Sequence, residues 1–273
     1  MIRATAAVVL REWRVQRRYP VSMVNLAFLT PLYQLALPTL LLGSAFVVGG
    51  SAVGLSRQTG TSDLAGWIGA GVLTATLLVG AVTSVYETLE ADRQTGVIEH
   101  SWASPAPRQA FVLGGVLTGS LFGTVSSIVL LTIAVTLLHG SFALPGVLLS
   151  LPVLLLMLAG NCGYSYLVGA AVLVLREADV IVELPTLLVM LFSGVFFPLT
   201  LLPAAARLPT YILPDTWELD LIRHLTLATR PLAPVAAEVA AAVATAAAWL
   251  AIGVWAFLST ERRLRAAGTL AQF

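Results

Sequence analysis

The stretch LAGWIGAGVLTATLLVGAVTSVY, residues 64–86, is apolar from end to end and contains no charged side chain. It exceeds the roughly 20 residues that a helix needs to cross the hydrocarbon core of a bilayer. Because lipid offers the backbone no hydrogen-bond partner, a segment of this kind is stable there only as a helix. Residues 64–86 therefore predict a membrane-spanning helix.

Five further apolar stretches surround this one along the chain. They cover residues 21–48, 111–138, 147–175, 180–197 and 235–258. Only the last two contain an ionisable residue, Glu183 and Glu238, each within about one turn of a helix end. The sequence therefore predicts an all-α membrane protein with six transmembrane helices, forming one transmembrane domain over residues 1–273.

The composition excludes several classes of protein. Of the 273 residues, 58% are hydrophobic and 11% are charged, whereas soluble domains are about a quarter charged. All 15 basic residues are arginines, so the chain has no lysine and no P-loop of its own. A net charge of +1 offers no general attraction for nucleic acid. The single Cys162 excludes an internal disulfide and a cysteine-based zinc cluster.

Arginines are unevenly distributed between the two sides that six spans define. Cytoplasmic flanks accumulate positive charge, and an even number of spans leaves both termini on one side. If that side is the cytoplasm, four arginines lie outside and eleven lie inside, namely Arg3, Arg11, Arg14, Arg17, Arg18, Arg93, Arg108, Arg176, Arg262, Arg263 and Arg265. We therefore expect both termini to be cytoplasmic. The apolar run after residue 20 is longer than that of a signal peptide, which indicates a retained span.

Residues 1–20 are amphipathic at a helical spacing. One stripe carries arginines and another carries apolar side chains; the arginines are Arg3, Arg11, Arg14 and Arg18, and the apolar residues are Ile2, Ala6, Val9, Leu10 and Trp13. This pattern predicts an interfacial helix. Its role is either an elbow that touches a partner protein or an anchor that binds lipid headgroups, and the two are compatible.

Residues 87–108 form the longest connection expected on the cytoplasmic side and the most charged stretch of the chain. The charged side chains are Glu87, Glu90, Asp92, Arg93, Glu99 and Arg108. The first half can continue the preceding helix to Gln94, and Gly96 offers a stop. We predict a short acidic helix that projects into the cytoplasm, although charge alone also fits an ordinary solvated connection.

Residues 198–234 are too apolar for an exposed loop, yet prolines divide them into pieces too short to span. Such pieces can enter a membrane only where protein buries their backbone. We predict a re-entrant helical hairpin over residues 199–213, on the outer side between the fifth and sixth spans. The alternative is an amphipathic segment that lies flat on the membrane with Tyr211 and Trp217 at the interface.

Few polar groups lie inside the predicted spans. Three glycines recur every fourth residue on the third span and favour close packing against another helix: Gly115, Gly119 and Gly123. The main polar side chains are Asn25, Gln34 and Asn161, which suit either hydrogen bonds between helices or a substrate path. No span has an ionisable group near its middle, as ion-coupled transporters and intramembrane enzymes usually do. Energy for any transport cycle must then come from elsewhere.

Three stretches of the chain together carry a family pattern. The first is the run from Glu87 or Glu90 to Glu99, with Ser104, Pro105 and Arg108. The second is Arg176, Glu177 and Asp179, just before the fifth span. The third is SGVFFP, residues 193–198, with Leu202, Pro203, Leu213, Pro214 and Arg223. Together with the six spans, they resemble the ABC-2 type permeases, the membrane subunits of bacterial ABC exporters for daunorubicin-like drugs, nodulation factors or polysaccharides.

The resemblance implies a complex in the bacterial cytoplasmic (inner) membrane. This chain would pair with a second permease, either another copy or a paralogue, on two copies of a separate ATPase subunit that binds ATP and Mg²⁺. It would itself hold no cofactor, metal or catalytic site. Coupling to the ATPase would use the elbow and the charged loop: Arg11, Arg14, Arg18, Glu87, Glu90, Asp92, Arg93, Glu99 and Arg108. An outer gate would be formed by Ser193, Gly194, Phe196, Phe197, Pro198 and Pro203.

The function expected from this resemblance is ATP-driven export of a hydrophobic or amphiphilic compound, such as a drug, a natural product or a lipid, and hence multidrug resistance. Asn25, Gln34 and Asn161 are the polar candidates along the substrate path. One alternative is a polysaccharide or glycolipid exporter of the same family. Another is a membrane immunity or scaffold protein that works without ATP. A secondary transporter is disfavoured because the span centres lack charge.

Overall fold

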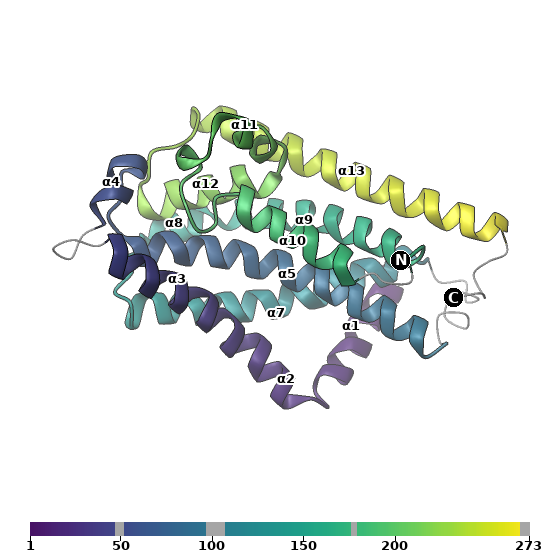
Figure 1. Cartoon of the computed structure of the whole chain (residues 1–273). Helices are drawn as coiled ribbons and strands as arrows, with labels where there is room; N and C mark the ends of the chain where they lie inside the picture. Colours follow the sequence, from purple (N-terminus) through teal and green to yellow (C-terminus); the bar gives the residue numbers. More distant parts are fainter. Residues whose placement is uncertain (47–51, 97–106, 176–178, 268–273) are drawn as a thin grey trace.

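The computed structural model describes residues 1–46, 52–96, 107–175 and 179–267, and these ranges contain helices and no strand (Figure 1). The predicted all-α class is therefore confirmed. In chain order the elements are α1 (Ile2–Gln16), α2 (Pro20–Val24), the π-helical turn η1 (Asn25–Leu29), α3 (Thr30–Phe46), α4 (Val53–Thr59), α5 (Leu64–Gln94), α7 (Gln109–Thr136), α8 (Leu144–Leu149), α9 (Leu151–Val172), α10 (Asp179–Phe192), the 3-10 turn η2 (Leu199–Leu201), α11 (Ala204–Arg207), the 3-10 turn η3 (Pro209–Ile212), α12 (Pro214–Leu227) and α13 (Val235–Ala267).

Four helices within the described ranges are long and apolar enough to cross a membrane: α5, α7, α9 and α13. They run side by side along the molecule (Figure 1) and coincide with the second, third, fourth and sixth predicted spans. The first predicted span is covered by α2, η1 and α3 in succession, and the fifth by α10, which has 14 residues. The chain is thus a multi-pass membrane protein, while the count of six spans stays a prediction.

Helix α5 lies at the centre of the bundle and contacts α3, α7, α9, α10 and α12. Its start is fixed by Asp63, whose side chain accepts a hydrogen bond from the Gly66 N–H at 2.8 Å. This bond satisfies one of the amides that a helix N-terminus leaves unpaired. The same carboxylate accepts bonds from the backbone N–H of Ser141 at 2.6 Å and from its hydroxyl at 3.1 Å. Asp63 therefore ties the start of α5 to the segment after α7.

The glycines predicted to favour close packing bring α7 against α5. A Cβ atom added at Gly119 would lie 1.9 Å from the carbonyl oxygen of Gly80, and one added at Gly115 would lie 2.8 Å from Cγ2 of Val85. These distances are shorter than any real carbon contact, so α7 can approach α5 this closely only because α7 has no side chain at these two positions. The close packing predicted for these glycines is confirmed.

Replacing Gly119 by alanine should push α5 and α7 apart. We expect a loss of about 1–3 kcal/mol in stability, the usual cost of overpacking a core. The measurement is the melting temperature of the purified chain. Gly54→Ala is the matched control, because a Cβ there meets no atom within 4 Å; equal melting temperatures for the two variants would contradict the packing argument.

The segment between α10 and α13 differs from the predicted hairpin. Residues 199–213 form three short turns, η2, α11 and η3, in place of two paired helices. Pro203 precedes α11 and Pro209 begins η3, because proline can start a helical turn but cannot continue one. The longest helix of this segment is α12, which packs against α5, α8, α9 and α13.

The bundle has two distinct ends (Figure 1). At the first, which we call the elbow end, α1 packs against α7, and α5 and α13 have their last turns. At the second, which we call the α12 end, α4, α8 and α12 cover the start of α5. The elbow end is the one predicted from the arginine distribution to face the cytoplasm.

Candidate functional site

Helix α1 is docked on the bundle. Val8 covers Gly114 of α7, where an added Cβ would lie 2.5 Å from Cγ1 of Val8. Trp13 stacks on Phe122 of α7 with ring centroids 5.8 Å apart. Other apolar residues of α1, such as Leu10, stay exposed. One apolar face of α1 thus packs on α7, while another is left for a lipid surface or a partner.

Arg11 joins α1 to α5. Its Nη1 donates to both carboxylate oxygens of Asp92, at 3.0 and 2.9 Å. Its Nε and Nη2 donate to the Glu12 carboxylate at 3.0 and 2.8 Å. Asp92 is only 6% exposed, so it belongs to an internal tie between two helices. The other predicted elbow arginines, Arg14 and Arg18, are exposed.

Arg93 joins the end of α5 to the end of α9. Its Nη1 donates to the carbonyl oxygens of Leu175 at 2.6 Å and Val172 at 3.2 Å, and its Nη2 donates to Glu90 at 2.8 Å. A guanidinium at this place satisfies carbonyls that a helix C-terminus leaves unpaired.

The stop expected at Gly96 is present, since its φ is +69° and its N–H bonds to the carbonyl of Arg93.

A further ion pair at the elbow end joins the start of α7 to α13. Nη1 of Arg108, before α7, donates to the carboxylate of Glu261 in α13 at 2.8 Å, and Arg265 bonds to the same carboxylate. Among the predicted coupling residues, Glu99 lies outside the described residues, as do Arg176 and Glu177 of the family pattern. Of the described ones, Arg11 and Asp92 join α1 to α5, Arg93 joins α5 to α9, and Arg108 joins the start of α7 to α13.

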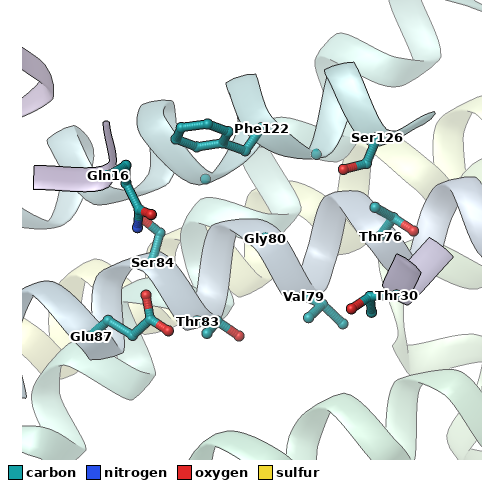
Figure 2. A pocket seen from close by; sticks show the side chains of 12 residues that line it. Gln16, Thr30, Thr76, Val79, Gly80, Thr83, Ser84, Glu87, Phe122 and Ser126 are labelled. Carbon is teal, nitrogen blue, oxygen red and sulfur yellow. The ribbon is translucent and has the colours of Figure 1, made fainter. Parts of the chain in front are cut away.

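A cleft opens beside these ion pairs, between α1, α3, α5 and α7 (Figure 2). It has an empty volume of about 630 Å³, part of which is open to the outside, and most of its exposed wall is apolar. Figure 2 shows Glu87, Ser84 and Gln16 at one end of the cleft and Thr30 with Thr76 at the other. Glu87 is the only charged side chain among the lining residues of this cleft.

The α12 end is organised by Arg223, which is 2% exposed. Its Nη1 donates to the carbonyl of Gly194 at 2.7 Å, and its Nη2 donates to the carbonyls of Val195 and Trp67, both at 2.9 Å. The guanidinium carbon also lies 3.5 Å from the ring centroid of Trp67. Burial lowers the pKa of Arg223 to about 9, against an opposing effect of Asp220. One side chain of α12 thus holds the turn after α10 and the start of α5.

Two glycines make this arrangement possible. Gly194 has a φ of +76°, a left-handed conformation in which other residues are strained. A Cβ added at Gly71 of α5 would lie 2.2 Å from the Val195 carbonyl oxygen, so only glycine there lets the turn approach α5. The SGVFFP run therefore has a structural role as the turn that Arg223 fastens to α5. We call the bonds from Arg223 to the carbonyls of Gly194, Val195 and Trp67 the Arg223 clasp.

The predicted gate residues surround the clasp to different degrees. Ser193 and Gly194 are buried, whereas Phe196, Phe197 and Pro198 are half-buried and Pro203 is exposed. Phe196 packs against two apolar clusters of the core. The structure brings the first five together at the end of α10 and leaves Pro203 at the start of α11. Their function as a gate stays a prediction.

Two buried carboxyl groups on α12 were missed by the sequence analysis. Asp215 and Glu218 are each 0% exposed, and their carboxyl oxygens have no hydrogen-bond partner among the residues that the structure describes. Burial raises the pKa of Asp215 to about 6, against a lowering effect of Tyr164 on α9. Burial also raises the pKa of Glu218, and the charge of Asp215 raises it further. Their three-residue spacing, which places them on one face of a helix, was the available signal.

Two other carboxylates at this end hold backbone instead. Asp220 accepts a bond from the N–H of Leu232 at 2.9 Å, and Glu238 accepts one from the N–H of Ala233 at 2.8 Å. Both bonds fix the loop between α12 and α13. Among the described residues, no group of three or more His, Cys, Asp or Glu side chains could hold a metal ion.

The polar residues proposed for a substrate path do not come together. Asn25 is exposed, and the side chain of Gln34 lies outside what the structure describes. Asn161 of α9 is 1% exposed, and neither of its amide atoms has a hydrogen-bond partner within the described ranges. The cleft between α1, α3, α5 and α7 contains none of the three.

Comparison with known proteins identifies a family. A sequence model of the ABC-2 type transporter family matches residues 3–227, from the start of α1 to the end of α12. No curated protein matches the chain.

Proposed function

The chain belongs to the ABC-2 type transporter family, and we propose that it is the membrane subunit of an ATP-driven exporter of a hydrophobic or amphiphilic compound. The family match over residues 3–227 is the observation that carries this proposal. Permeases of this family are transporter subunits that work with an ATPase subunit and are not themselves enzymes. In the proposed complex, two copies of the ATPase bind ATP and Mg²⁺ beneath two permeases in a bacterial inner membrane.

The ion pairs at the elbow end support a route for coupling. Arg11 ties α1 to α5, Arg93 ties α5 to α9, and Arg108 ties the start of α7 to α13. A push on α1 or on the connection after α5 would reach α9 through these contacts, and it would reach α7 and α13 through the close packing of α7 on α5. The exposed Arg14 and Arg18 would then meet the ATPase, while Asp92 transmits the movement from inside.

The cleft in Figure 2 supports an amphiphilic substrate. Its wall is mostly apolar, and it carries hydroxyl groups and one carboxylate. Pockets of this composition bind molecules with an apolar body and a few polar groups. In the proposed cycle the compound enters at the elbow end and leaves past the turn that the Arg223 clasp holds.

The test is to purify the tagged full chain gently from its native membrane and to ask whether an ATPase comes with it. We expect a subunit with a Walker A motif in a fixed ratio to this chain, and ATP hydrolysis stimulated by transported compounds. A reproducible absence of any ATPase, with the chain intact, would refute the exporter and favour a membrane protein that works without ATP.

The same complex can be used to test the role of the ion pair between Arg11 and Asp92. Asp92→Arg should uncouple hydrolysis from the transported compound, because it sets a guanidinium against Arg11 in a buried place. Adding Arg11→Asp restores the opposite charges and should recover most of the stimulation. If the double variant is as defective as the single one, Asp92 does not act through Arg11.

A further inference from the structure

We propose that the cleft between α1, α3, α5 and α7 binds an amphiphilic amine, with the protonated amine against Glu87 and the apolar body along α5 and α7 (Figure 2). The inference rests on the proposed function in one respect: the bound amine is the exported compound. It names a ligand class and a site, and it follows from the charge and the lining of the cleft.

The charges at the Glu87 end of the cleft are unbalanced. Glu12 lies close enough to act on Glu87 electrostatically, and Arg11 bonds to both Glu12 and Asp92. These contacts connect three carboxylates with one guanidinium. Glu87 forms no ion pair with the residues that the structure describes, and the chain has no lysine to supply one. A cation at Glu87 would relieve the repulsion between these carboxylates.

The rest of the cleft fits an apolar body. Gly80 and Gly119, which touch, leave the wall without a side chain at that place, and Phe122 lines the α7 side (Figure 2). Hydroxyl groups such as those of Thr83 and Ser126 add weak polarity, which suits ester or hydroxyl groups on the ligand. Because the only charged lining residue stands at one end, the site would fix the direction of the ligand as well as its charge.

The charges around the cleft also disfavour ligands that carry a negative charge. An anionic amphiphile would place its head beside Glu87 and Glu12, where it is repelled. A neutral one would gain the apolar contacts but not the ion pair. The site should therefore rank a protonated amine above its neutral analogue, and Glu87 should be responsible for the difference.

The experiment measures equilibrium binding to the full chain in phosphatidylcholine nanodiscs without ATP. The probes are dansyl-labelled diaminododecane, which keeps one free amine, and its N-acetylated form, followed by dansyl fluorescence. We expect the wild-type chain to bind the amine about tenfold more tightly than the acetylated probe, as one charge-assisted contact would give. Glu87→Gln should abolish this preference and leave the acetylated probe unaffected.

Two further variants keep the result unambiguous. Glu90→Gln makes the same charge change one turn away, at a carboxylate already paired with Arg93, and should leave binding unchanged. Thr83→Leu fills the wall of the cleft and should weaken both probes. The proposal is overturned if Glu87→Gln retains the preference for the amine, or if Thr83→Leu affects neither probe.

A separate transport assay distinguishes this inference from the proposed function. If the amine binds with charge preference but the purified complex does not move it with ATP, the site stands and the amine is not its cargo. If ATP-driven movement of the amine is the same in the wild type and Glu87→Gln, the exporter stands and this site is wrong. Because binding is measured without ATP, a role of Glu87 in coupling to the ATPase does not affect the binding measurement.

Discussion

Replacing Arg223 by lysine should lower the melting temperature of the purified chain by on the order of 10 °C. The guanidinium donates to carbonyls of Gly194, Val195 and Trp67 from a planar fork, and a lysine ammonium cannot reach them all from one point. At least one buried carbonyl would lose its partner, and the packing on Trp67 would also be lost. Together these losses amount to about 3 kcal/mol or more.

The matched control is Arg230→Lys, which makes the same replacement at an exposed arginine of the α12 end. It should change the melting temperature little, since exposed arginines contribute little to stability. Limited proteolysis adds a local readout, because loss of the clasp should expose residues 193–213 before the long helices unfold. A melting temperature for Arg223→Lys within a degree or two of the control would rule out the clasp as a fastening of this end.

Raising the pH from about 5 to about 8 should destabilise the chain through the buried carboxyls of α12, by roughly 1.5 kcal/mol from Asp215 alone. Its pKa is raised to about 6 in the folded chain by burial, so folding favours the protonated form. The stabilisation from that proton is complete below the pKa that Asp215 has in the unfolded chain, and it disappears as the pH rises through about 6. Glu218, whose pKa burial also raises, acts in the same direction.

The measurement is the melting temperature against pH for the wild type and for the double variant Asp215→Asn, Glu218→Gln. Neutral amides of the same shape should make the decline between pH 5 and pH 8 shallower. Glu183→Gln is the control, since that carboxyl is exposed and should leave the slope unchanged. Parallel curves for the wild type and the double variant would show that other groups cause the pH dependence.

What the sequence could predict was set by local patterns. Length without charge predicted spans at residues 64–86, 111–138, 147–175 and 235–258, which coincide with α5, α7, α9 and α13, because hydropathy and helix length are properties of a single segment. The four-residue spacing of Gly115, Gly119 and Gly123 predicted a close helix contact for the same reason. The family pattern included Arg223 but gave no indication of the bonds that it makes.

What the sequence could not predict depends on distant pairs. Arg11 meets Asp92 across 81 positions, and Arg108 meets Glu261 across 153, and no periodicity relates such residues. The buried Asp215 and Glu218 were missed because prolines divide residues 198–234 into short pieces, which gave no indication of a buried helix at residues 214–227. Only the packing of α12 against α5, α9 and α13 buries them.

The Arg223 clasp recognises carbonyl oxygens, which every residue possesses. Its fit is therefore indifferent to side-chain identity in the turn it holds, apart from the two glycines that give the backbone its shape. A protein built this way can exchange the side chains of this turn, through natural drift or by grafting a loop from a relative, without losing the bonds that hold the turn in place. The side chains of the turn and the bonds that hold it can therefore change independently of each other.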